Sequence, residues 1–186
     1  MIRLQEGEAA AFEELVARYR GPLRGYFINR LRDQALADDL VQETLLKVHT
    51  GFWDYIPLGR FRGWLFRIAH NLTVDTVRRQ ARDVVLSAYR GREDDDGPDR
   101  MARLADAIDT PAAATILGER ADLIDDLIGA LPEDQRETVI LHYFQGVPLP
   151  EVAIAMETNL STCKSRLRLA REKLKGRIES LGLVAP

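Results

Sequence analysis

Residues 158–179 separate apolar and basic side chains onto opposite faces of one helix, and no other stretch constrains the fold as strongly. Apolar side chains recur at helical spacing on one face, at Cys163, Leu167, Ala170, Leu174 and Ile178. Basic side chains occupy the opposite face, at Lys164, Arg168, Arg171 and Lys175. The stretch holds seven Lys or Arg against two Glu, a local net charge of 7 − 2 = +5. A charge run is ordinarily a solvated surface, but its confinement to one face favours binding to an anionic partner.

The residues before this helix predict that it belongs to a helix-turn-helix. A break at 146–148 (Gly-Val-Pro) is followed by a short helical stretch at 149–156. Ser161 and Thr162 are both suited to cap the next helix and would leave backbone N–H groups free to meet a phosphate. A short helix, a tight turn and a helix with one basic face together predict DNA binding.

Composition excludes several classes of protein. The single cysteine excludes an internal disulfide and a cysteine-cluster metal site, and the three histidines lie far apart in the sequence. Neither a phosphate-cradling glycine loop nor a nucleophile elbow is present, so we expect no catalytic residues, no metal, no cofactor and no enzyme activity. No apolar run approaches the roughly 20 residues that span a bilayer, and the first residues lack the apolar core of a signal peptide. We therefore expect a cytoplasmic protein with no membrane insertion.

Helical periodicity predicts an all-α fold of two small helical domains joined by a flexible acidic linker. Helices are expected at about 12–27, with a possible break at Gly21-Pro22, and at about 34–50, 60–82, 132–144 and 149–156. Residues 60–82 carry six Arg against one Asp, whereas residues 83–109 carry eight acids against four Arg. The acids and glycines of this second segment cannot sustain a packed core. We predict domains at 1–85 and 115–186, the second being the helix-turn-helix, with the linker at 86–114.

Three stretches in this order resemble the extracytoplasmic-function (ECF, group IV) sigma factors of the sigma-70 family of bacterial RNA polymerase. They are residues 38–48 (DDLVQETLLKV), 61–71 (FRGWLFRIAHN) and 131–174. In that family the first stretch binds polymerase, the second opens the −10 promoter element and the third reads the −35 element. The resemblance implies that domain 1–85 is sigma region 2 and domain 115–186 is sigma region 4.

The resemblance also assigns roles to individual residues. Polymerase binding is expected on the exposed helix face that holds Asp39, Gln42, Glu43 and Leu46. The −10 element is expected to contact Tyr55 as a stacking platform, Asn71 in the capture of a flipped base, and Arg67, Arg78 and Arg79 at backbone phosphates. Trp64 has the spacing of a core residue, so we favour packing over base contact for it.

The −35 element is expected to contact residues near the start of the last helix, namely Ser161, Thr162, Lys164, Ser165, Arg166, Arg168 and Arg171. Lys164 and Arg168 are suited to donate to guanine, while Arg166 and Arg171 are better suited to phosphates. Family members often have Gly in the turn where this chain has Glu157, so Thr158-Asn159 is expected to supply any left-handed residue.

The predicted function is that of a promoter-specificity factor that binds core RNA polymerase and promoter DNA and directs transcription initiation. The resemblance implies an anti-sigma partner that silences it. Two alternatives remain. A stand-alone helix-turn-helix regulator would explain the last third of the chain but not the aromatic and basic residues of 61–79. An adaptor that mimics a sigma factor and sequesters an anti-sigma protein would not need Lys164, Arg168, Arg78 and Arg79.

Overall fold

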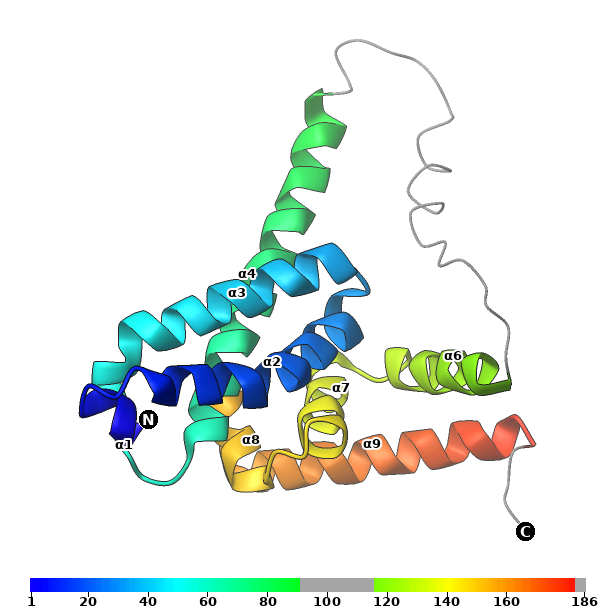
Figure 1. Cartoon of the computed structure of the whole chain (residues 1–186). Coiled ribbons are helices and arrows are strands. Elements are labelled where there is room, and N and C mark those ends of the chain that lie inside the picture. Colours follow the sequence, from blue (N-terminus) through cyan, green and yellow to red (C-terminus); the bar gives the residue numbers. More distant parts are fainter. Residues whose placement is uncertain (91–115, 183–186) are drawn as a thin grey trace.

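The computed structural model describes residues 1–90 and 116–182, with side chains described for 1–86 and 123–182. This part of the chain is helical without strands, which confirms the all-α class (Figure 1). The first helical unit, residues 1–90, contains α1 (Ile2–Gln5), α2 (Ala10–Leu31), α3 (Gln34–Gly51), a 3-10 turn η1 (Phe52–Asp54) and α4 (Phe61–Arg90). The second helical unit, residues 116–182, contains α6 (Ile116–Gly129), α7 (Glu133–Val139), a π-helical segment η3 (Ile140–Phe144), α8 (Leu149–Ala155) and α9 (Leu160–Ser180).

In the first unit, α2, α3 and α4 pack around a core to which each helix contributes large side chains. Leu23, Tyr26 and Phe27 come from α2, and Leu65 and Phe66 come from α4. The expected break at Gly21-Pro22 does not occur, because α2 runs through Pro22. Pro22 is exposed, so water can hydrogen-bond the carbonyl group that its missing N–H leaves without a partner.

Between α2 and α3 the chain turns within two residues. Arg32 ends α2 in the left-handed region at φ 57°, and its N–H donates to the Ile28 carbonyl at 3.0 Å. Asp33 caps α3 by accepting the Leu36 N–H at 3.0 Å. This tight corner sets α3 against α2.

In the second unit, α9 packs against α6, α7 and α8, and α6 and α9 lie side by side in Figure 1. Leu167 and Ala170 of α9 form a buried cluster with Leu131 and with Val139 of α7. Cys163 is fully buried, as its place on the apolar face predicts, and burial raises the pKa of its thiol. The apolar face of α9 therefore holds the helix-turn-helix together.

The turn between α8 and α9 differs from the sequence prediction in two ways. Glu157 itself adopts the left-handed conformation at φ 48°, whereas Asn159 is extended. Asn159 is also the cap of α9, because its side chain accepts the Thr162 N–H at 2.8 Å. Ser161 and Thr162 lie inside the helix and do not cap it.

The two units are packed against each other rather than separated. α8 contacts the first turns of α4 (Figure 1), and the buried cluster that holds Leu23 and Phe66 continues through Ile140, Val147 and Val152. The second half of α4 projects away from this shared core. The acidic linker expected at 86–114 falls largely outside the described residues, and the proposed domain limits stay a prediction.

Candidate nucleic-acid interface

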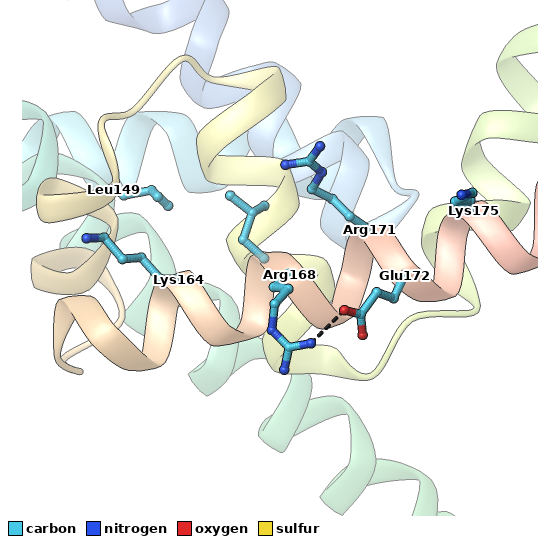
Figure 2. Close-up of a pocket in the computed structure, with 7 residues that line it drawn as sticks. Leu149, Lys164, Arg168, Arg171, Glu172 and Lys175 are labelled. Atoms are coloured by element: carbon cyan, nitrogen blue, oxygen red, sulfur yellow. Dashed lines mark hydrogen bonds and ion pairs between the residues drawn. The ribbon is translucent and has the colours of Figure 1, made fainter.

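The exposed face of α9 forms a basic groove. Its lining residues are Leu149, Lys164, Leu167, Arg168, Arg171, Glu172 and Lys175, and its volume is about 490 Å³ (Figure 2). Arg168 Nη1 donates to Glu172 Oε1 at 2.6 Å, an ion pair whose side chains are more than half exposed. Among the described side chains Lys164 and Arg171 have no ion-pair partner. The groove thus presents cations that an anionic ligand can reach.

The remaining residues expected to contact the −35 element are arranged differently. Ser165 is exposed, but the Arg166 side chain is 21% exposed and ion-paired with Asp134 of α7. Ser161 Oγ donates to Asn159 Oδ1 at 2.6 Å, and the Thr162 N–H is taken by the same oxygen. The structure therefore brings Lys164, Arg168 and Arg171 together with exposed Ser165. Ser161, Thr162 and Arg166 instead interact with other residues of the second unit.

The four residues expected to bind polymerase lie on one face of α3. Asp39, Gln42, Glu43 and Leu46 are all exposed, and their spacing places them on successive turns. Leu46 is 61% exposed although it is apolar. The opposite face holds buried Leu40, Thr44 and Val48, so the exposed stripe is not required for packing of the core.

A second polar stripe follows α4. Arg67, Asn71, Arg78 and Arg79 are all exposed, and the first three lie on one side of the helix. Arg67 is not free, because its Nε donates to Glu157 Oε1 at 2.7 Å. Arg78 and Arg79 lie on the projecting half of α4 (Figure 1).

The loop before α4 corrects one residue assignment. Tyr55 is only 7% exposed and packs against Phe61 and Trp64, with ring centroids 5.7 and 5.2 Å away. Burial raises the pKa of its phenol. A residue with so little exposed surface is poorly placed to stack on a base. Trp64 is half-buried and belongs to the core, in agreement with the packing interpretation.

Trp53 is the exposed aromatic side chain of this loop, and sequence reasoning did not single it out. Its side chain is 68% exposed, and Ile56 and Leu58 are exposed to 70% and 71%. The indole ring also rests on Phe52 with centroids 4.6 Å apart. Helical periodicity cannot rank aromatic residues in a loop, so only the density of aromatics at 52–55 could have pointed to it.

A buried charge cluster joins the two units, and no sequence pattern predicted it. Glu137 is 1% exposed and accepts the Tyr26 hydroxyl at 2.6 Å, while His70 Nδ1 lies 3.3 Å from the same oxygen. Arg30 Nε lies 2.6 Å from Glu137 Oε2 in an ion pair without hydrogen-bond geometry, and neither atom has a hydrogen-bond partner among the described residues. Arg30 also donates to Glu133 at 2.9 Å.

The environment of the cluster determines its charge state. Burial by itself would raise the pKa of Glu137, but the hydrogen bond with His70 and the charge of Arg30 outweigh it and hold the pKa below its usual range. Burial and the Glu137 carboxylate raise the pKa of Tyr26, which stays a hydrogen-bond donor. Glu137 is therefore ionised and fixed at neutral pH.

Two sequence families match the two units. Residues 15–83 match Sigma-70 region 2, and residues 121–174 match Sigma-70, region 4. The chain is 31% identical to RNA polymerase sigma factor CarQ of Myxococcus xanthus over 98% of both chains. It is 29% identical to the ECF RNA polymerase sigma-E factor of Haemophilus influenzae, over 96% of this chain and 93% of the relative.

Two solved structures share the fold. The sigma factor RpoE of Bartonella quintana, in complex with the anti-sigma factor NepR, has a TM-score of 0.67 at 23% identity, with 91% of this chain and 97% of that chain covered. CnrH in complex with the cytosolic domain of CnrY has a TM-score of 0.66 at 24% identity, with 94% and 92% covered.

Within the described helices, none is long and apolar enough to cross a membrane. The same residues hold no cluster of side chains suited to a metal ion. Sigma factors are initiation factors rather than enzymes, and they bind core RNA polymerase and promoter DNA. From its two matched regions and its relatives, this chain belongs to the sigma-70 family, as an ECF sigma factor that gives RNA polymerase its promoter specificity.

Proposed function

We propose that this chain is a group IV sigma factor that uses three separate surfaces. The exposed α3 stripe of Asp39, Gln42, Glu43 and Leu46 binds core polymerase. The loop 52–60 and the polar stripe of α4 bind the −10 element, and the basic groove of α9 binds the −35 element. The domains correspond to region 2 at 1–85 and region 4 at 115–186, joined by the linker at 86–114.

The observation that carries this proposal is the row of exposed basic side chains along one side of α9. Lys164, Arg168 and Arg171 face solvent on the side of the helix next to its buried stripe, and Leu167 of that stripe lines the same groove. A helix that presents such a face after a tight turn can enter the major groove, where Lys and Arg donate to guanine. Lys164, Ser165 and Arg168 read base edges, while Arg171 and Arg166 contact phosphates, Arg166 after leaving Asp134. Ser161 and Thr162 lie at the end of α9 that enters the groove.

For the −10 element, the exposed ring of Trp53 replaces Tyr55 as the platform for an unstacked base. Stacking on an aromatic side chain is worth about 1–3 kcal/mol per base, which offsets the cost of removing a base from the duplex. Asn71 captures the extruded base, and Arg67, Arg78 and Arg79 hold the backbone. Tyr55 stabilises the loop that carries this site through its ring contacts with Phe61 and Trp64.

An anti-sigma protein controls access to these surfaces, and the chain acts in the cytoplasm, where polymerase and promoters are found. The two solved structures with the same fold support control by a protein partner, because each is a complex. RpoE is bound to the anti-sigma factor NepR, and CnrH is bound to the cytosolic domain of CnrY.

The experiment that tests the α9 assignment compares Arg168→Ala with Lys173→Ala in holoenzyme binding to a library of −35 variants. Lys173 is the matched control, because it is exposed and basic but faces a groove beside α6. Arg168→Ala should lose about 1–3 kcal/mol of discrimination at one base pair. Lys173→Ala should keep the wild-type preference, and equal losses on every sequence for Arg168→Ala would move that residue to the phosphate contacts.

A further inference from the structure

The side chain of Gln5 holds the backbone of the loop that carries Trp53. Its amide Nε2 donates to the Phe52 carbonyl at 2.7 Å and to the Tyr55 carbonyl at 2.9 Å. An amide nitrogen has two N–H donors, and both are used here. The two acceptors come directly before Trp53 and two residues after it. One side chain therefore connects the first residue of η1 with the residue that follows η1.

Gln5 is itself held in place, because other side chains of α1 tie this helix to the first unit. Leu4 is buried. Arg3 Nη1 donates to Glu14 Oε2 of α2 at 2.9 Å. In the contacts between elements, α1 lies against both α2 and η1. The short helix α1 thus connects α2 to the loop.

The loop gains little stability from burial of its own side chains. Trp53, Ile56 and Leu58 are each more than two-thirds exposed. Within residues 52–60 only Tyr55 is buried. A segment with so few buried apolar contacts depends on hydrogen bonds to the rest of the protein for its order. The Gln5 amide supplies two of these bonds, one on each side of Trp53.

We propose that Gln5 is a positioning residue for the −10 element, which fixes the backbone on both sides of Trp53 so that the indole ring is ready to receive an unstacked base. The proposal rests on the role assigned to Trp53 above and goes beyond it, since Gln5 acts through the loop rather than on the base. Ordering a loop during binding costs affinity, and a loop that is already ordered avoids this cost. Loss of the two hydrogen bonds should therefore weaken binding of single-stranded −10 DNA without affecting the surfaces on α3 and α9.

The test variant is Gln5→Met, which keeps the length of the side chain and suits a helix but has no hydrogen-bond donor. The matched control is Gln34→Met, because Gln34 is an exposed glutamine of the same unit at the start of α3. The first readout is fluorine NMR of the full chain labelled with fluorotryptophan. The chain has two tryptophans, and Trp64, which packs against the core, is the internal reference.

Gln5→Met should shift the Trp53 resonance toward that of free fluorotryptophan and leave the Trp64 resonance nearly unchanged. The second readout is holoenzyme binding to a fluorescein-labelled single strand that carries the −10 element of a promoter transcribed by the holoenzyme. Gln5→Met should weaken this binding about fivefold, because the net contribution of one hydrogen bond corresponds to roughly twofold to tenfold in an equilibrium constant. Binding to a duplex with only the −35 element should not change, and Gln34→Met should behave as wild type in every readout.

A double-mutant cycle separates positioning of Trp53 from a general loss of stability. In a Trp53→Ala background, Gln5→Met should cause no further loss of single-strand binding, because no ring remains to be positioned. The same fivefold loss in that background would show that Gln5 does not act through Trp53 and would overturn the proposal. An unchanged Trp53 resonance in Gln5→Met would overturn it as well.

A failure of the −10 role of Trp53 has a different signature. If Gln5→Met shifts the Trp53 resonance but Trp53→Ala binds the single strand as wild type does, Gln5 orders the loop and the loop is not the platform for a base. That result overturns the positioning role in DNA binding together with the assignment of Trp53.

Discussion

Replacement of Glu137 by alanine should destabilise the protein strongly, because the change leaves buried polar groups without partners. The Arg30 side chain is 4% exposed and would keep only Glu133, and the Tyr26 hydroxyl would lose its 2.6 Å acceptor. Removing one partner of a buried ion pair typically costs about 3–5 kcal/mol. Glu137→Gln keeps the volume and an acceptor, so its cost should be lower, about 1.5–3 kcal/mol for a hydrogen bond with a charged group.

Urea denaturation at pH 7, followed by helical circular dichroism, measures these losses. Glu133→Gln is the matched control, because Glu133 pairs with the same Arg30 at 2.9 Å but is 65% exposed and should cost less than about 1 kcal/mol. The stability lost in Glu137→Ala cannot exceed the free energy of docking between the two units, because the units can separate instead of leaving the buried groups without partners. If Glu137→Ala costs no more than Glu133→Gln, the two units are apart in solution and the buried cluster does not form.

Three further predictions follow from single residues. The pKa of Glu137 is held below its usual 4.5, so its contribution to stability is present above that value and is lost as the pH falls through the lower, folded-state pKa. The stability difference between wild type and Glu137→Gln, measured by urea titrations at a series of pH values, should therefore shrink as the pH falls below 4.5. Glu157→Gly should be about 1–2 kcal/mol more stable than Glu157→Ala in thermal unfolding, because both lose the ion pair but only glycine relieves the left-handed backbone; equal stabilities would refute the strain. Trp53→Ala should weaken holoenzyme binding to single-stranded −10 DNA by about 1–3 kcal/mol while Trp53→Tyr retains most of it, and equal losses in the two variants would argue against stacking.

The sequence predicts which side chains are buried and which are exposed where the hydrophobic pattern lies within a single helix. The stripe of α9 predicted both buried Cys163 and the exposed line from Lys164 to Lys175. The exposed face of α3 could be predicted in the same way, since Leu40 and Val48 fix which side is buried. Each of these assignments depends only on residues within a few turns of each other.

Features that depend on distant residues could not be predicted. In the sequence Glu137 looks like an ordinary surface acid of a short helix, and only the docking of α2 and α4 buries it among Tyr26, Arg30 and His70. Likewise, Tyr55 and Trp53 are two residues apart in a loop, so tertiary packing alone decides which ring is buried. At Glu157 the local preference favours Asn159 as the left-handed residue, but Asn159 is already used to cap α9.

The most direct test of promoter specificity is transcription in vitro with purified bacterial core polymerase on a library of promoter fragments, with and without this chain. A promoter-specificity factor should support initiation from a defined subset of fragments that share −35 and −10 elements, and only when the chain is present. If the chain neither joins the core nor changes which fragments are transcribed, while still binding duplex DNA alone, the assignment of this chain as a promoter-specificity factor is contradicted.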